Sequence, residues 1–288
     1  MKIATYYDPS VSGRNDGPPL YWTTAMKDMK HDVVHLSGKQ LPNGEWGKFD
    51  LHMWVDWGED ALAGVLPYKP VSLESVHTSV YVTSDTHLGY DYRLKKAREF
   101  DYVFCNQIRA VEEFERDGVK ARWLPHAVEP RAYPNEPVTI KKYDIGFVGF
   151  VTFKKRAEML DRLFKAFPNF WYGHKLFEEC ADIYRKSRIV FNTAAVDDIN
   201  MRCFEATATG AFLLTEWVPT LKECFEDGKH LITFRTIEDA IAKAHYYLAH
   251  EDEREEIAKA GMEHTLAHHT YQHRVSEMLK IAGNGNGR

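Results

Sequence analysis

The stretch that decides the fold reads Asp197-Asp198-Ile199-Asn200-Met201-Arg202-Cys203-Phe204-Glu205-Ala206-Thr207-Ala208-Thr209-Gly210-Ala211-Phe212-Leu213-Leu214-Thr215. It predicts a short helix that runs into an apolar strand. Asp198 and Asn200 are both suitable N-cap residues, and Gly210 stands where a left-handed residue commonly ends a helix. Free N–H groups at such a helix start attract anions, while a carboxylate on the helix accepts hydrogen bonds from hydroxyls. These features favour a ligand that carries both phosphates and hydroxyls, as a nucleotide sugar does.

Short apolar, β-branched or aromatic runs recur between amphipathic segments along the rest of the chain. This pattern is typical of repeated βα units on a mostly parallel sheet, so the predicted class is α/β. The strands are expected near residues 2–7, 32–36, 51–56, 79–83, 101–105, 121–124, 143–149, 169–172, 188–192, 211–214 and 231–234. A helix is predicted at 21–30, and two more are predicted within 238–281.

Length and proline content predict two domains. A chain of 288 residues exceeds the usual size of one domain. Residues 124–137 contain four prolines, which exclude helix interior and central strand, so we place the interdomain linker there. The predicted division is an N-terminal domain at 1–135, a second domain at 136–270, and a helix end with a flexible tail at 271–288.

The quoted stretch resembles the nucleotide-sugar site of the GT-B glycosyltransferases, specifically the large retaining family with an acidic pair in the pattern E-x7-E. Asp197 and Glu205 have this spacing, with the first glutamate shortened to aspartate. The resemblance implies that the first acid faces the donor sugar and that the second binds the ribose hydroxyls. Asn200-Met201-Arg202 followed by Phe204-Glu205-Ala206 looks like the spore-maturation-protein-like branch. Here residues 198–200 replace the usual Gly-rich turn.

Other segments carry the same resemblance. Residues 143–150, followed by Lys154-Lys155-Arg156, look like the first strand and phosphate loop of the donor-binding half. Residues 187–192 resemble the strand that leads into the acidic helix, and residues 225–230 and 269–271 resemble late loops of that half. The resemblance implies a GT-B fold of two Rossmann-like domains whose parallel sheets face across a cleft. The acceptor then binds to the first domain and the nucleotide-sugar donor to the second.

The residues expected to hold the donor diphosphate are basic. Its negative charge grows as the glycosidic bond breaks, so cations and N–H dipoles must face it. The candidates are Lys154, Lys155, Arg156 and Arg202, together with Gly149 and Asn200, which begin the phosphate loop and the acidic helix. Lys154 or Arg156 is a better candidate than Lys155. The alternative interpretation of residues 154–156 is a solvated helix start, although cations are disfavoured there unless an anion is present.

The sequence predicts no metal site and no cofactor besides the donor. No two aspartates stand two positions apart, so the Asp-x-Asp motif of many glycosyltransferases with the other common fold is missing. Arg and Lys in place of a metal are the consistent alternative. The spacing of His264, His268, His269 and His273 would suit a metal on one helical face. Such histidines are more often partners of a helix carboxyl terminus.

Two loops of the N-terminal half contain further candidates. Asp85 and His87 directly follow a predicted strand, where either could face the sugar or the acceptor hydroxyl. Capping of the next helix is an equally good interpretation of this segment. Gly13 lies in the loop 8–19, which is either a flexible lid or a plain connection. That loop is not G-x-G-x-x-G, which counts against a dehydrogenase.

Composition and charge exclude several classes of protein. With 44% hydrophobic and 27% charged residues, the chain has the composition of an ordinary soluble protein. Its formal net charge of −5 argues against nucleic acid as the favoured partner, although nucleic acid stays open as an acceptor. The four cysteines form no C-x-x-C pair. We find neither a signal peptide nor an apolar run of about 18 residues, so we expect a cytoplasmic protein without a membrane span.

The expected reaction is transfer of a sugar from a nucleotide-diphosphate sugar to an acceptor hydroxyl, without a metal and, by the resemblance, with retention. Two alternatives share the scaffold. A nucleotide-sugar 2-epimerase needs no acceptor, and a noncatalytic nucleotide-sugar-binding protein shows no turnover. The sequence alone leaves the donor base, the sugar and the acceptor undefined.

Overall fold

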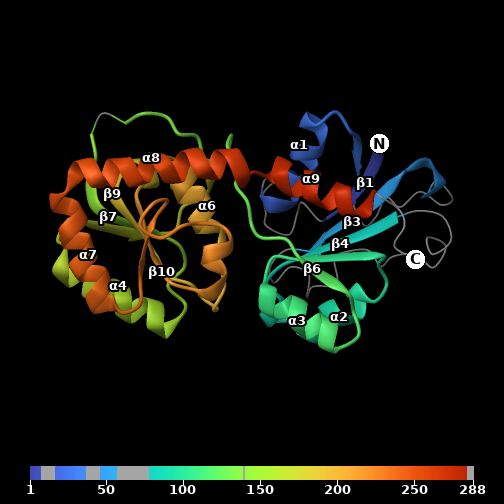
Figure 1. Ribbon diagram of the computed structural model, residues 1–288, viewed down its shortest axis with the longest axis horizontal. Coiled ribbons are helices and arrows are strands. Elements are labelled where there is room, and N and C mark those ends of the chain that lie inside the picture. The colour runs from blue at the N-terminus through green and yellow to red at the C-terminus, as the bar shows by residue number, and fades with distance from the viewer. Residues whose placement is uncertain (8–16, 37–45, 57–77, 139, 284–288) are drawn as a thin grey trace. The chain divides into compact units, whose positions relative to one another are not determined.

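The computed structural model describes residues 1–7, 17–36, 46–56, 78–138 and 140–283 (Figure 1). The chain divides into two compact units. The first unit consists of Met1–Pro125 and Tyr271–Arg288, and the second consists of His126–Thr270. Each unit contains one parallel β-sheet covered by helices, and all of the predicted strands are present, which confirms the α/β prediction.

The first unit is built on a six-stranded sheet with the order β2-β1-β3-β4-β5-β6, in which all paired strands are parallel. Its strands are β1 (Lys2–Tyr6), β2 (Asp32–His35), β3 (Leu51–Asp56), β4 (Thr78–Thr83), β5 (Tyr102–Cys105) and β6 (Ala121–Trp123). Its helices are α1 (Pro18–Asp28), α2 (Tyr90–Ala97), α3 (Ile108–Arg116) and α9 (Tyr271–Ala282), with short 3₁₀ turns at Trp46–Lys48 and Thr86–Leu88. Strand β3 is buried along its whole length, as expected for a central strand of a parallel sheet.

The second unit is built on a five-stranded parallel sheet with the order β11-β10-β9-β7-β8. Its strands are β7 (Tyr143–Val148), β8 (Phe170–Gly173), β9 (Ser187–Asn192), β10 (Leu213–Glu216) and β11 (Ile232–Phe234). Its helices are α4 (Lys154–Ala166), α5 (Phe177–Lys186), α6 (Met201–Ala208), α7 (Ile237–Ala249) and α8 (Glu251–His268), with a 3₁₀ turn at Pro219–Glu223. The strand order reverses between β7 and β9, and ligands of open α/β sheets bind at such a switch point.

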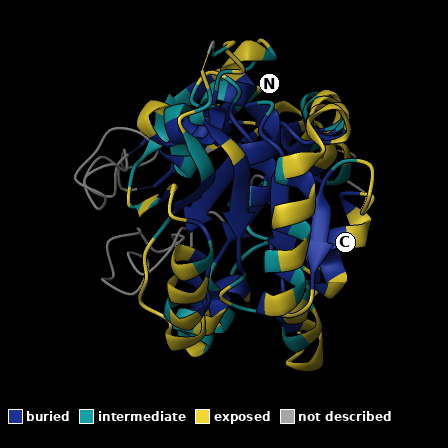
Figure 2. Cartoon of the chain, turned by 90° about the vertical axis from the view of Figure 1, so that its left-hand side faces the viewer, coloured by how far each residue is buried: buried dark blue, intermediate teal, exposed yellow. Residues whose placement is uncertain are grey.

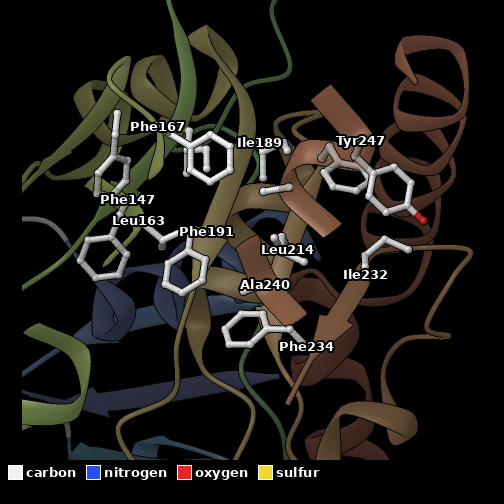
Figure 3. Packing of buried hydrophobic residues seen from close by; sticks show 14 of the residues in the cluster. Phe147, Leu163, Phe167, Ile189, Phe191, Leu214, Ile232, Phe234, Ala240 and Tyr247 are labelled. Carbon is white, nitrogen blue, oxygen red and sulfur yellow. The ribbon is translucent and has the colours of Figure 1, made fainter. Parts of the chain in front are cut away.

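Aromatic side chains fill the core between the second sheet and the helices α4 and α7 (Figure 3). Phe191 stacks on Phe234 with ring centroids 5.1 Å apart, and Phe147 lies 6.5 Å from Phe191. Leu163 of α4 and Ala240 of α7 cover these rings. Figure 2 shows how burial is distributed along the chain: the strands are buried, and the outer faces of the helices are exposed. Each such large apolar side chain contributes about 1.5–3 kcal/mol by leaving water.

The division of the chain differs in two places from the one predicted. Residues 126–135 belong to the second unit, because Val128 N donates to His269 O at 3.0 Å and Arg185 Nη1 donates to Pro134 O at 2.7 Å. The prolines prevent regular structure there but do not prevent packing. Residues 271–282, expected as a helix end and tail, form the separate helix α9 of the first unit. No helix in the described ranges is both long enough and apolar enough to cross a membrane.

Candidate functional site

Helix α6 begins directly above the carboxyl end of β9. Its N-cap is Asn200, whose side chain pairs with that of Asn192, the last residue of β9, at 3.1 and 3.2 Å. Among the described residues no side chain caps the helix. Cys203 N donates to Asn200 O at 3.1 Å, so the N–H groups that an uncapped start offers an anion are those before Cys203. Gly210 has a φ of +75°, as predicted for the residue that ends this helix. Asp198 is not the cap, because its Oδ1 accepts hydrogen bonds from Ile199 N at 2.8 Å and Thr220 Oγ1 at 2.6 Å.

Arg202 projects from the first turn of α6 over the ends of β7 and β9. Its Nε donates to Val148 O at 2.7 Å, and its Nη1 donates to Asn192 Oδ1 at 2.5 Å. The guanidinium carbon lies 4.8 Å from the centroid of the Phe147 ring. Gly149 follows β7 with a φ of +155°, and a Cβ atom there would lie 2.4 Å from Arg202 Nη2. Only glycine therefore allows this approach of the guanidinium to the backbone.

Arg156 reaches the same strand ends from the first turn of α4. Its Nη1 donates to Phe150 O at 2.8 Å, and its Nη2 donates to Thr193 O at 3.2 Å. Burial and the positive charge of Arg202 lower the pKa of the Arg156 guanidinium to about 10, against the opposing effect of Glu216. The two arginines are thus close enough to repel each other. Clustered like charges of this kind favour an anion beside them.

The two predicted lysines do not join this pair of arginines. Lys155 forms an ion pair with Glu216, whose Oε2 also accepts hydrogen bonds from Thr193 Oγ1 at 2.7 Å and Ala194 N at 3.3 Å. The side chain of Lys154 is 92% exposed and lies 3.8 Å from Glu158 on its own helix. The cationic centre of this site therefore consists of Arg156 and Arg202, with Lys155 neutralised at its margin.

The two acids of the predicted pair have opposite environments. Glu205 is buried in the second turn of α6. Burial raises the pKa of the Glu205 carboxyl, while the Tyr133 hydrogen bond and the charge of Arg202 oppose that rise. Asp197 is exposed in the loop between β9 and α6, and the described part of the chain gives its carboxylate no partner.

The other predicted residues lie in the first unit. Asp85 follows β4 with a left-handed backbone, φ +47° and ψ +39°, at the start of the turn Thr86–Leu88. His87 is exposed, with its Nδ1 3.5 Å from Gln107 Nε2. Capping of that turn by the Asp85 side chain is not observed. Gly13 lies outside the described residues.

Asn192 connects β9 with Arg202 and Asn200 of the site, although sequence reasoning did not select it. Besides its contacts with Arg202 and Asn200, its Nδ2 donates to Thr215 Oγ1 at 2.9 Å. Its side chain is 1% exposed. Asn192 ends β9, and Thr215 and Glu216 are the last two residues of β10. The rule that ligands bind at the carboxyl ends of parallel strands could therefore have found them.

Three of the four histidines expected as a helix terminus partner or a metal site pack together, because the ring centroid of His264 lies 5.0 Å from those of His268 and His269. His273 instead lies exposed on α9 of the first unit. His264 Nε2 and His269 Nε2 lie 2.7 and 2.9 Å from the same carbonyl oxygen, Cys224 O. The ring of His230 stacks on that of His264 at 3.9 Å, and burial lowers the pKa of both side chains. Within the described ranges, no group of three or more His, Cys, Asp or Glu side chains is arranged to hold a metal ion.

Two Rossmann-like units, each with one parallel sheet, are the architecture of the GT-B fold. Residues 147–280, which hold the site residues described above in the second unit, match a family model described as glycosyl transferase-like. The search of curated protein sequences found no match.

Solved structures similar to this chain come from GT-B glycosyltransferases. Sucrose-phosphate synthase from Thermosynechococcus elongatus is 10% identical with a TM-score of 0.64, covering 99% of this chain and 98% of that one. HepE from Anabaena, in complex with UDP and glucose, is also 10% identical with a TM-score of 0.64, covering 99% and 100%. TarM from S. aureus is 12% identical with a TM-score of 0.59, and the match spans 80% of this chain but 55% of TarM. At these identities the likeness establishes the fold.

Proposed function

We propose that this protein is a glycosyltransferase that moves a sugar from a nucleotide-diphosphate sugar to an acceptor hydroxyl. The observation that carries the proposal is the meeting of Arg156 and Arg202 at the ends of β7 and β9, beside the uncapped start of α6. Two fixed guanidinium groups and free N–H groups suit a diphosphate. Glu205, one turn further along α6, supplies the acceptor oxygens that ribose hydroxyls need. The family match and the UDP in the HepE structure support the same donor class.

Each residue of the second unit has a distinct part in this proposal. Arg202 holds the diphosphate through Nη2, since Nε and Nη1 already bind the protein. Arg156 is 7% exposed. It contributes its positive charge from the inner side of the loop that follows β7, where it donates to Phe150 O. Because Gly149 has no side chain, it leaves room for Arg202 and for the phosphates. We assign Asp197 to the hydroxyls of the donor sugar, as the E-x7-E resemblance implies.

The same arrangement favours cleavage of the bond between the donor sugar and the nucleoside diphosphate. Negative charge accumulates on the diphosphate in the transition state, and preorganised cations stabilise it without reorganising. Arginines in this role remove the need for a metal, so we propose a metal-independent reaction. Retention of configuration is proposed from the resemblance to the retaining E-x7-E family. Asp85 and His87 of the first unit are our candidates for contacts with the acceptor or the sugar.

Thermal unfolding with a panel of UDP, GDP, ADP and dTDP sugars tests the proposal. A ligand at about a hundred times its Kd adds about 2.7 kcal/mol of stability. The matching donor should raise the Tm of the wild type and of Lys154→Ala, which removes an exposed cation. It should raise the Tm of Arg202→Ala and Glu205→Ala far less. Equal shifts in all four proteins would remove Arg202 and Glu205 from the site.

Analysis of products separates transfer from the two alternatives. Incubation with the donor alone yields an epimerised nucleotide sugar if the protein is a 2-epimerase. A binding protein without activity shows the Tm shift but leaves the donor intact with every acceptor offered. Release of the nucleoside diphosphate together with a glycosylated acceptor is the result that we expect.

A further inference from the structure

An aromatic pair follows the carboxyl ends of β7 and β8 in the second unit. The Phe150 ring stacks on the His174 ring, with ring centroids 4.0 Å apart and an angle of 25° between the ring planes. His174 is exposed, and Phe150 is 61% exposed. Two stacked rings leave an outer face on each ring, and a third planar group can extend the stack there.

The backbone holds this pair in place. Gly149 N donates to Gly173 O at 2.8 Å, which joins the two residues directly before the aromatic side chains. Phe150 O in turn accepts a hydrogen bond from Arg156 Nη1 at 2.8 Å. A stacking surface on a fixed backbone has little ordering entropy to lose when a ligand binds. The pair is therefore preorganised for a planar group.

The loop that contains Phe150 also exposes further apolar surface. Val151 is 40% exposed and Phe153 is 45% exposed, so three large apolar side chains within residues 150–153 face water. Single exposed apolar residues are common, whereas a local concentration of them marks a binding surface. This one lies at the carboxyl end of a parallel strand, where ligands of α/β sheets bind.

The aromatic pair lies beside the arginines that we assign to the diphosphate. Arg202 covers the ends of β7 and β9, and the pair follows β7 and β8, which is the next strand along the same edge. Neighbouring strands are about 4.8 Å apart. An added Cβ on Gly149, the residue before Phe150, would lie 2.4 Å from Arg202 Nη2. A nucleotide whose diphosphate meets Arg202 therefore has the aromatic pair within reach of its base.

We propose that Phe150 and His174 form the nucleobase subsite, in which the base of the donor stacks on the Phe150 ring. This inference rests on the proposed function and extends it to the base, for which the two arginines and Glu205 provide no contact. Every base has an aromatic face, so stacking gives affinity without reading hydrogen-bonding groups. Trp217, a second exposed ring, follows β10, but the guanidinium carbon of Arg235 already lies 3.9 Å from its ring centroid.

Calorimetry with UDP, GDP and ADP, each compared with inorganic pyrophosphate, tests the subsite. Phe150→Leu keeps an apolar side chain but removes the ring, so each nucleotide that binds the wild type should bind roughly tenfold more weakly. Pyrophosphate has no base and should bind both proteins equally. Phe150→Tyr, which retains an aromatic face, should keep most of the nucleotide affinity. Trp217→Leu is the matched control, because it removes an exposed ring at the end of β10, and it should change none of these affinities.

Proton NMR of the bound nucleotide locates the base directly. Stacking should shift the base protons upfield in the wild type, and Phe150→Leu should abolish that shift. Equal nucleotide affinity in Phe150→Leu and the wild type overturns the subsite, as does a loss that appears in Trp217→Leu instead. A loss of pyrophosphate affinity as large as that of the nucleotides would show that Phe150 only supports the arginines. A wild type that binds none of the three nucleotides contradicts the proposed function itself, and the inference fails with it.

Discussion

At the scale of single residues, the contact between Gly149 and Arg202 links backbone conformation to ligand binding. Arg202 cannot easily yield to an added side chain, because two of its nitrogens are bonded to Val148 O and Asn192 Oδ1. Gly149 also has a φ of +155°, which L side chains rarely adopt. A small change at this position should therefore affect the cation that we assign to the diphosphate.

Gly149→Ala should lose most of its affinity for UDP. The new Cβ would lie 2.4 Å from Arg202 Nη2, so the guanidinium must leave its place. Gly228→Ala is the matched control, since Gly228 has a φ of +83° but nothing within 4 Å of an added Cβ. Both variants should lose about 1 kcal/mol of stability from the unfavourable backbone. If calorimetry shows equal UDP affinity in the two variants, the close approach of Arg202 has no part in binding.

Lys96 of α2 should lower the stability of the first unit at neutral pH. Its side chain is 2% exposed, its Nζ has no hydrogen-bond partner among the described residues, and burial lowers its pKa to about 8, against the attraction of Asp56 and Glu99. Below pH 8 the Lys96 ammonium is charged in both the folded and the unfolded protein. Burial of that charge then lowers the stability of the folded state. Between about 8 and 10.5 the unfolded chain keeps a proton that the folded protein releases, so stability rises with pH.

Lys96→Met should therefore be more stable than the wild type at pH 7, by roughly 1–3 kcal/mol. The advantage should shrink as the pH approaches 10.5, the ordinary pKa of lysine. Urea unfolding at several pH values measures this difference. Lys95→Met, which changes an exposed neighbour on the same helix, should show neither effect. A constant difference across the pH range would show that Lys96 does not titrate as the structure indicates.

At the scale of elements, the ends of β7 and β9 and the starts of α4 and α6 assemble the site. The alternation of strands and helices predicted these elements well, because parallel strands buried on both faces read as continuous apolar runs. The resemblance to the E-x7-E pattern likewise selected Glu205, and the need for cations at a diphosphate selected Arg202. Pairings over long sequence distances, such as that of Arg156 with Thr193 O, have no local pattern and could not be predicted. Nor could the sequence tell that Lys155 would be neutralised by Glu216.

Asn192→Ala should weaken the connection between β9 and α6. The change removes the acceptor of Arg202 Nη1 and leaves Thr215 Oγ1 without that contact in a buried place. Unsatisfied buried groups of this kind cost about 1–3 kcal/mol, so the Tm should fall and UDP should bind more weakly. Asn169→Ala is the control, because it removes an exposed hydrogen bond to Lys142 O at 2.9 Å. Normal UDP affinity in Asn192→Ala would mean that Arg202 needs no support from β9.

At the scale of the whole molecule, the chain passes between the two units twice. It leaves the first unit after Pro125 and returns to it at Tyr271. Helix α9 then packs beside α1 (Figure 1), where the ring centroid of Tyr271 lies 5.4 Å from that of Tyr21 and 5.5 Å from that of Trp22. The last helix in sequence thus completes the unit that contains the first strand. A substitution in α9 should therefore also destabilise α1.

Tyr271→Ala should destabilise the first unit while leaving the proposed donor site of the second intact. Tyr271 is 2% exposed, and removal of a buried aromatic side chain costs about 3–5 kcal/mol because a cavity remains. Hydrogen exchange followed by mass spectrometry should show faster exchange in peptides from α1 and α9. Peptides from β7 and β9 should exchange as in the wild type, because they belong to the separate core around Phe147 and Phe191. Tyr246→Ala, which removes a tyrosine that is 46% exposed, should leave both sets of peptides unchanged. Faster exchange in β7 and β9 of Tyr271→Ala would instead show that the two units unfold as one cooperative body.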